Sequence, residues 1–185
     1  MASTERTNNL LAALAVAIAD DVRRATERAA GRSDAVPAVL ASLRWAPQGR
    51  TIDEIRQIVG LTPSGGVRVV DRMVDDGLAR RGRGDDRRTV VVTLTPRGRH
   101  VARAVLAARS AAVERYLGDL GEADRARLET LAERLLTTHV RQRLIERSTG
   151  EHPAWTCRLC DQDACGRPAG DCPAQREAQR AAAGG

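Results

Sequence analysis

Hydrophobic residues recur at helical spacing along three long stretches of the chain, one near its start and two in its second half. The first, Asn8–Ala30, repeats an apolar residue every four positions and keeps its charges off that stripe. The others, Pro96–Leu120 and Glu122–Arg147, predict two more amphipathic helices, and such helices favour docking on a distant element or a second subunit. Residues 1–7 are polar and are expected to be flexible. In the last stretch the inward positions would be Leu128, Leu131, Leu135, Leu136, Val140 and Leu144.

Two shorter helices are predicted between the first long helix and residue 60. Ser33 or Asp34 would cap the first of them, which ends at the segment Ala46–Gly49. The second opens with the capping box Thr51–Glu54 and places its isoleucines on one face. The turn Val59–Leu61 then leads into another helix, so that the two helices around this turn form a helix-turn-helix.

Residues 61–98 are predicted to form a helix, a tight turn, a two-stranded hairpin and the start of another helix. Thr62 can cap the first helix, and Pro63 suits its first position, where an N–H group is not needed. The strands are expected at Leu78–Arg81 and Thr89–Leu94, where residues alternate between the two faces. The helix would turn Val67, Val70, Met73 and Val74 inward and Ser64, Arg68, Arg72 and Asp75 outward.

The loop between the two strands, residues 82–88, has the sequence GRGDDRR and cannot pack into a core. A helix with short and basic side chains fits the major groove of DNA, and a thin arginine-bearing loop fits the narrower, electronegative minor groove. Gly65 and Gly66 are unusual inside a helix, where each costs about 1 kcal/mol relative to alanine. Either a bare backbone lets this helix lie closer to DNA, or the glycines are merely tolerated.

The loop and the residues after it resemble the MarR family of winged helix-turn-helix regulators. The resemblance rests on Asp86-Arg87-Arg88 at the tip of the hairpin and on Val92–Gly98 just after it, and it covers about Asn8–Arg147. It implies an α+β, mainly helical fold, namely a winged helix-turn-helix with a long helical dimerisation region.

The same resemblance implies a division into lobes and a set of DNA-contacting residues. The DNA-binding lobe would span about residues 35–98, and the dimerisation helices about residues 8–30 and 95–147. The start of the reading helix would face base edges or phosphates, Arg87 or Arg88 would enter the minor groove, and Asp86 would brace the loop through an ion pair. The candidate DNA-binding residues are Thr62, Pro63, Ser64, Gly65, Arg68, Arg72, Arg83, Asp86, Arg87 and Arg88.

Composition and charge narrow the class of partner. The formal net charge is +6 and the isoelectric point about 10.3, which favours an anionic partner, with nucleic acid ahead of a membrane because arginines cluster in the loop. No apolar run approaches the ~20 residues that span a bilayer, and no secretory signal is recognised, so we expect a cytoplasmic protein with no membrane partner. The sequence carries no nucleophile elbow, phosphate-binding loop or dinucleotide fingerprint, which predicts that it is not an enzyme.

The tail, residues 148–175, loses the helical periodicity and contains all four cysteines in the spacing C-x2-C-x4-C-x6-C-P. Because a reducing compartment disfavours disulfides, Cys157, Cys160, Cys165 and Cys172 are expected to bind one soft metal centre. The close first pair suits Zn2+, whereas the uneven spacing and the final proline resemble ferredoxin-type ligation, which slightly favours an iron–sulfur cluster. Four free thiols in a disordered tail are the alternative, and residues 176–185 are expected to be disordered.

Together these features predict a sequence-specific transcriptional regulator, most readily a repressor, that binds double-stranded DNA as a homodimer on a pseudo-palindromic operator. Its four-cysteine site would sense redox or metal state. One alternative is a repressor that responds to a small-molecule effector and carries a purely structural zinc. Another is a winged helix that holds a protein instead of DNA.

Overall fold

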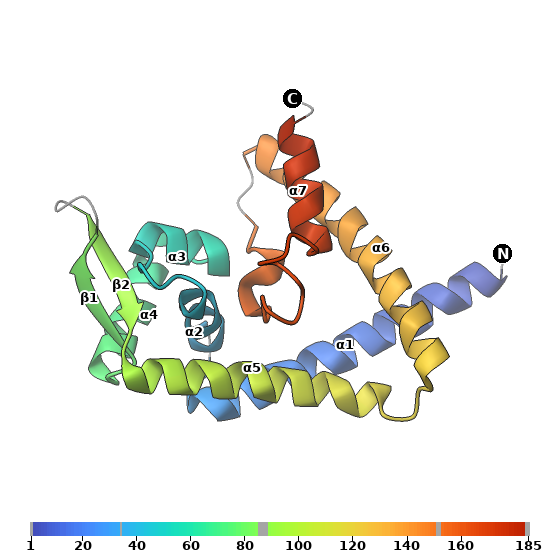
Figure 1. The fold of residues 1–185 in the computed structure, drawn as a ribbon, viewed down its shortest axis with the longest axis horizontal. Helices are drawn as coiled ribbons and strands as arrows, with labels where there is room; N and C mark the ends of the chain where they lie inside the picture. Colours follow the sequence, from blue (N-terminus) through green and yellow to red (C-terminus); the bar gives the residue numbers. More distant parts are fainter. Residues whose placement is uncertain (1, 34, 85–88, 151–152, 184–185) are drawn as a thin grey trace.

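The structure is a computed structural model, and it describes residues 2–33, 35–84, 89–150 and 153–183. Within these residues the chain forms seven α-helices, one short 3-10 helix and a two-stranded antiparallel sheet (Figure 1). The predicted α+β, mainly helical winged-helix fold is confirmed. None of the described helices combines the length and the apolar character that crossing a bilayer requires.

Two long helices, α1 (Ala2–Ala30) and α5 (Pro96–Leu117), lie side by side and form the base of the molecule (Figure 1). The Tyr116 hydroxyl on α5 donates a hydrogen bond to Asp21 on α1, with 2.8 Å between the oxygens. Helix α6 (Glu122–Ser148) then rises away from the end of α5. The three long helices predicted from the hydrophobic pattern are therefore present.

Helix α1 begins at Ala2 rather than at Asn8, so the expectation of a flexible start is wrong for residues 2–7. Two features of the sequence allow the extension. Residues 2–7 contain neither glycine nor proline. Glu5 lies in the first turn, where the helix dipole favours a negative charge.

A compact lobe stands on one end of this base, and its sheet forms the edge of the molecule (Figure 1). Its strands are antiparallel, with Ala79 opposite Leu94 and Arg83 opposite Val90. The side chains that fill its core are completely buried and come from every element of the lobe and from α5. The elements are α2 (Val36–Arg44), α3 (Ile52–Val59), α4 (Pro63–Asp75), β1 (Ala79–Arg83) and β2 (Val90–Leu94). The core includes Val36, Val39, Leu40, Ile55, Val70, Met73, Val92 and Val105.

Two details of the lobe differ from the prediction. Helix α2 has Ala35 at its N-cap and no side-chain cap, so Ser33 does not cap it, and Asp34 lies outside the described residues. In α4, Val67 is 43% exposed, whereas Gly66 and Val69 are buried beside Val70 and Met73. The inner face of α4 is therefore rotated relative to the prediction, because Gly66 packs against α3 as part of that face.

The prediction that the leucines of α6 point inward is wrong for the first half of this helix. Only Val140 is buried, and Leu136 and Leu144 are partly buried against the tail. Several apolar residues in the first half of α6 and on α1 stay exposed, because none of the described elements covers them. They are Leu128, Leu131 and Leu135 on α6 and Leu10, Leu11, Leu14 and Val16 on α1.

The tail is ordered where it is described. A 3-10 helix, η1 (Thr156–Leu159), is followed by a series of turns and by helix α7 (Pro173–Ala183), which packs on α6. The expectation that residues 176–185 are disordered is therefore wrong for residues 176–183. Two contacts explain the order: Ala174 is buried against Val140, and the buried Glu177 carboxylate forms an ion pair with Arg141 on α6.

Candidate nucleic-acid interface

The helix-turn-helix consists of α3, α4 and the turn between them. The predicted capping box is present: Thr51 Oγ1 accepts a hydrogen bond from the Glu54 N–H (3.2 Å), and the Glu54 carboxylate accepts one from the Thr51 N–H (2.7 Å). Gly60 ends α3 in the left-handed region, with φ of +74°. Thr62 caps α4 as predicted, because its Oγ1 accepts a hydrogen bond from the Gly65 N–H at 3.1 Å.

The outer face of α4 is polar and open to solvent. Ser64, Arg68, Arg72 and Asp75 are all exposed, as predicted, and Pro63 occupies the first turn. Within the described part of the chain, no hydrogen bond or ion pair engages the guanidinium group of Arg68. This side chain can therefore reach a ligand without first breaking a contact with those residues.

The two glycines of α4 have different surroundings. A Cβ atom at Gly66 would lie 2.9 Å from Arg56 Cβ and 3.4 Å from Ile52 Cγ2, so this glycine lets α4 pack closely on α3. Gly65 is only partly buried, and a Cβ there would lie 3.1 Å from Thr62 Oγ1. Close packing of α4 on α3 thus explains why residue 66 is glycine. The two alternatives drawn from the sequence, close approach to DNA and mere tolerance, did not include this reason.

An ion pair holds the end of α4 against α1. Arg32 donates two hydrogen bonds to the Asp76 carboxylate, from Nε at 2.8 Å and from a terminal nitrogen at 2.5 Å. Arg97 on α5 donates to the Asp76 carbonyl at 2.9 Å. The pKa of Asp76 is lowered, chiefly because Arg32 hydrogen-bonds to the charged carboxylate. These contacts fix the direction in which the outer face of α4 points.

The hairpin, or wing, is fastened to α4 and to the loop before α3. Arg81 on β1 forms an ion pair with Asp71 on α4, and Arg80 Nε donates to Thr93 Oγ1 at 3.3 Å across the sheet. The backbone of Arg50 forms a bridge to Val92, with hydrogen bonds of 3.1 and 2.7 Å, and so adds a third short segment to the wing. The wing therefore has a fixed position beside α4.

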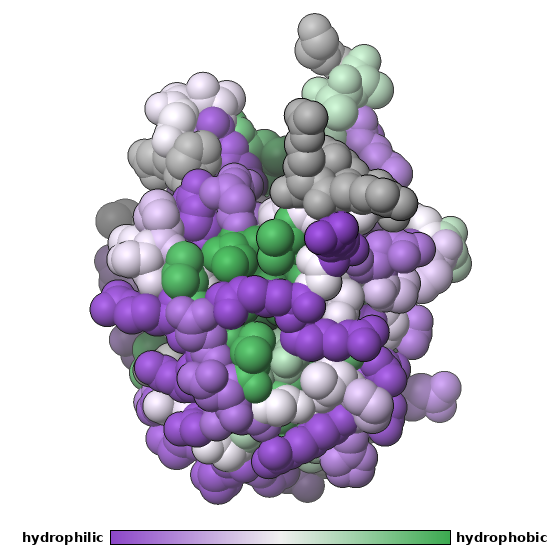
Figure 2. Space-filling view, turned by 90° about the vertical axis from the view of Figure 1, so that its left-hand side faces the viewer, coloured by the Kyte–Doolittle hydropathy of each residue, from purple (hydrophilic) through white to green (hydrophobic). Residues whose placement is uncertain are grey.

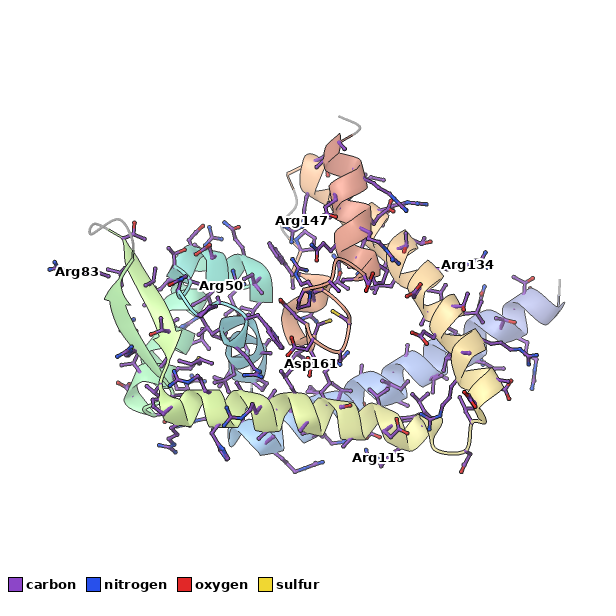
Figure 3. All side chains as sticks on the ribbon, viewed as in Figure 1. Arg50, Arg83, Arg115, Arg134, Arg147 and Asp161 are labelled. Atoms are coloured by element: carbon purple, nitrogen blue, oxygen red, sulfur yellow. The ribbon has the colours of Figure 1, made fainter. Side chains whose placement is uncertain are left out.

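Basic side chains cover the solvent side of the wing. Arg80, Arg81 and Arg83 are exposed on β1, and Figure 3 shows Arg83 pointing away from the lobe near the wing tip. Seen from this end, the surface is largely hydrophilic around a smaller apolar patch (Figure 2). The predicted residues Asp86, Arg87 and Arg88 lie outside the described residues.

Sequence reasoning missed the ion pair between Asp71 and Arg81. It had expected a brace from Asp86, which is close in sequence to the loop arginines. The signal for the observed brace is an acidic residue on the exposed side of α4 that faces a basic first strand. This signal becomes clear only when the tight turn places the helix and the strand side by side.

The sequence matches no protein-family model and no curated protein. Several solved structures match the fold. YusO from Bacillus subtilis is 28% identical, with a TM-score of 0.62, over 71% of this chain and 93% of YusO. CouR from Rhodococcus jostii RHA1, in a structure bound to p-coumaroyl-CoA, is 22% identical, with a TM-score of 0.56, over 71% of this chain and 92% of CouR.

A further match is to a MarR family protein and concerns the fold. Rv2887, a MarR family protein of Mycobacterium tuberculosis in a complex with DNA, is 23% identical, with a TM-score of 0.56, over 69% of this chain and 95% of Rv2887. The chain has a MarR-like winged-helix fold. Solved structures that share this fold are named as transcriptional regulators and not as enzymes.

The tail of this MarR-like protein brings its four cysteines to one place. Cys172 is buried, Cys157, Cys160 and Cys165 are partly buried, and none forms a disulfide. All four line a cavity of about 400 Å³ against α6, beside Glu133. Among the described residues, no three His, Cys, Asp or Glu side chains are arranged to hold a metal ion. The metal site stays a prediction.

The first two cysteines influence each other's protonation. The Cys157 thiol donates a hydrogen bond to Cys160, which lowers the pKa of Cys160 to about 6, and the nearby Arg109 and Arg167 lower it further. The same hydrogen bond, together with burial, raises the pKa of Cys157. This hydrogen bond therefore favours ionisation of Cys160 over ionisation of Cys157.

Proposed function

We propose that this MarR-like protein is a sequence-specific DNA-binding transcriptional regulator that acts as a homodimer on a pseudo-palindromic operator and represses by occupying it. One observation carries the proposal: the polar face of α4 and the arginine-bearing wing lie beside each other and are joined by the ion pair of Arg81 with Asp71. A helix and a basic hairpin in this arrangement suit neighbouring major and minor grooves. The DNA complex of Rv2887, which shares the fold, supports it.

In this proposal the first half of α4 enters the major groove. The hydroxyl groups of Thr62 and Ser64 and the first N–H groups of the helix suit phosphate oxygens. Arg68 suits a bidentate contact to guanine, since its guanidinium has no partner among the described residues. Pro63, Gly65 and Arg72 complete the contact surface on either side.

The wing would lie along the minor groove. Arg83 approaches the backbone at the wing tip, Arg87 or Arg88 enters the groove, and Asp86 braces the loop. A narrow minor groove has an enhanced negative potential, which favours an inserted arginine.

The exposed apolar residues of α1 and α6 support the homodimer. Leu10, Leu14, Leu131 and Leu135 are each about half exposed in the single chain, and large exposed apolar patches mark interaction surfaces. A second copy would bury them and place two reading helices about one helical turn of DNA apart. Light scattering that returns a monomer at micromolar concentration would contradict this part of the proposal.

DNA binding is tested by changing the two parts of the interface separately. Arg87→Ala/Arg88→Ala should weaken binding to all sequences and reduce its salt dependence, because phosphate or minor-groove contacts are lost. Arg68→Ala should relax base preference at one position, at a cost of about 1–3 kcal/mol. Arg180→Ala, which removes an exposed charge from α7, is the control for net charge.

The measurement is fluorescence anisotropy on a duplex selected from a random-sequence library, at several salt concentrations. If both interface variants bind like the Arg180→Ala control across the whole salt range, the interface is assigned wrongly. If the parent protein shows no preference among duplexes, the proposed regulator function fails.

We further propose that the four cysteines bind one metal centre, an iron–sulfur cluster slightly ahead of Zn2+. Their convergence on one cavity supports this, as does the close pair Cys157 and Cys160 at η1. Brown protein with iron and acid-labile sulfide, purified without oxygen, would identify a cluster, and one zinc per chain would identify a zinc site. Metal-free protein whose four Cys→Ser changes leave DNA binding unaltered would contradict both.

A small-molecule effector is a second candidate signal. The complex of CouR with p-coumaroyl-CoA supports it, together with a cavity of about 460 Å³ in this chain. Leu144, Trp155 and Ala178 supply apolar walls, and Arg143 lies at its edge. Such an effector combined with a purely structural zinc would give DNA binding that responds to the effector and not to metal loading.

A further inference from the structure

The cysteine-bearing segment, residues 153–172, lies between α6 and the DNA-binding lobe (Figure 1). It runs from the end of α6 to the start of α7, and Figure 3 places its Asp161 between α5 and α7, beside α2. Its contacts therefore reach both the DNA-binding lobe and α6.

Two hydrogen bonds tie this segment to the lobe. The backbone N–H of Trp155 donates to the carbonyl of Ile58, in the last turn of α3, at 2.8 Å. The indole N–H of Trp45, just after α2, donates to the carbonyl of Cys160 at 3.2 Å. Trp155 and Cys160 are the residues that flank η1, so both ends of the turn carrying the close cysteine pair are fixed to the lobe.

Close packing adds to these bonds at the turn of the helix-turn-helix. A Cβ atom at Gly60 would lie 2.8 Å from the Cβ of Ala154, so the tail backbone rests directly against the turn. Leu159 packs against the core of the lobe. We call these contacts, made by residues 154–160 with Trp45, Ile58 and Gly60, the joint.

The opposite side of the cysteine cluster belongs to α6. Cys172 is buried with Val140, and Cys157 and Cys165 pack against the same small apolar cluster. The cavity that all four thiols line is closed on this side by Glu129, Glu133 and Leu136 of α6. Cys160 is thus fixed at the joint, Cys165 and Cys172 lie on the helical arm, and Cys157, beside Cys160 in η1, also contacts the α6 side.

We propose that a thiophilic metal centre on these four cysteines locks the DNA-binding lobe to α6 through the joint, and that operator affinity depends on its loading. This rests on the proposed DNA-binding function. Metal–thiolate bonds would connect Cys160, which the lobe holds, and Cys157, which contacts both sides, to Cys165 and Cys172 on the α6 side. Loading then fixes the angle between lobe and arm, and in a dimer that angle sets the spacing of the two reading helices.

The coupling must act in both directions. If metal loading changes operator affinity by some factor, operator DNA changes metal affinity by the same factor, because the two binding events share one free-energy cycle. Zn2+ and an iron–sulfur cluster use the same thiolate ligands, so the mechanism is common to both, and metal analysis of the loaded protein says which is bound.

The experiment compares metal-loaded full-length protein with the same protein stripped by a chelator under reducing conditions. Anisotropy on the selected duplex should give affinities that differ at least about tenfold. The test variant Trp45→Phe/Leu159→Ala removes the indole donor and the Leu159 contact and keeps all four thiols. Its metal content should equal that of the parent, and its loaded and stripped forms should differ by less than about twofold.

Trp155→Phe is the matched control. It makes the same tryptophan-to-phenylalanine change, but in the cysteine-bearing segment, where the joint uses the backbone N–H of Trp155, which phenylalanine retains. This control should keep the tenfold difference. If the double variant loses metal, Trp45→Phe alone becomes the test variant. Its ratio of loaded to stripped operator affinity should be smaller than that of the parent by a factor of about 2–10, because one hydrogen bond is lost.

Failure of this inference differs from failure of the proposed function. Selective DNA binding that is equal in loaded and stripped protein overturns the joint and leaves the regulator intact. A full tenfold difference in the joint variants, or a parent protein that takes up no metal, also overturns it. Absence of selective DNA binding in both forms overturns the proposed function instead.

Discussion

Replacing Gly66 by alanine tests how closely α4 packs on α3. The added Cβ would lie 2.9 Å from Arg56 Cβ, which is attached directly to the backbone of α3 and cannot swing aside. It would also lie 3.4 Å from Ile52 Cγ2. We expect Gly66→Ala to push the two helices of the helix-turn-helix apart and to destabilise the protein.

The size of the destabilisation by Gly66→Ala follows from comparison with Gly65→Ala in the same turn of α4. At Gly65 the new Cβ would lie 3.1 Å from Thr62 Oγ1 and 3.5 Å from Leu61 Cβ, contacts that a small shift relieves. Both changes gain about 1 kcal/mol of helix propensity, so this gain cancels between them. What remains is the overpacking at Gly66, which costs about 1–3 kcal/mol.

Thermal unfolding followed by circular dichroism, at fixed protein concentration and without DNA, measures this difference. For a chain of this size about 1 kcal/mol shifts Tm by roughly 2–4 °C, so Gly66→Ala should melt about 2–12 °C below Gly65→Ala. Equal melting temperatures would refute the packing argument. Weakened DNA binding by Gly65→Ala at unchanged Tm would instead support a close approach of Gly65 to DNA.

Two further predictions concern the hydrogen bonds that Asp21 and Asp76 accept. Tyr116 is the only tyrosine, and its hydrogen bond to Asp21 raises the pKa of the phenol, so absorbance titration should give a pKa above about 10. Asp21→Asn should lower this pKa, and an unchanged titration would contradict the contact. Arg32 lowers the pKa of Asp76, so this pair stabilises the fold above pH about 3.9 and is lost as pH falls through the lowered value. Asp76→Asn should therefore reduce Tm at neutral pH and match the parent in strong acid, and a difference that persists in acid contradicts it.

Local signals in the sequence were sufficient for the helix-turn-helix. The capping box at Thr51 and the Thr62–Pro63 start of α4 act within one turn of helix, so residue identity alone predicts them. The alternation along β2 likewise puts Val90, Val92 and Leu94 on one face, and the structure buries Val92 and Leu94 and leaves Val90 exposed. For the same reason the polar face of α4, with Ser64 and Arg68, could be identified before the fold was known.

Features that depend on distant partners could not be predicted in the same way. The inner face of α4 is rotated because Gly66 packs against Arg56 of α3. A search for helical periodicity that counts only large apolar residues does not assign a glycine to the inner face. The order of α7 depends on Glu177 pairing with Arg141 across 36 positions of sequence. A polar, alanine-rich segment without that partner resembles a disordered tail.

Helix α6 carries both the proposed dimer surface and the contacts with the tail. Leu128, Leu131 and Leu135 are exposed, whereas Leu136, Val140 and Leu144 pack against the tail and its cysteines. At about 100° per residue these two sets point to nearly opposite sides of the helix. In the proposed dimer a second copy would therefore hold one side of α6, while the proposed metal centre would hold the other side and, through the joint, the helix-turn-helix. Because a packed helix moves as a rigid body, a change in the angle between lobe and α6 would reposition each reading helix relative to the dimer axis.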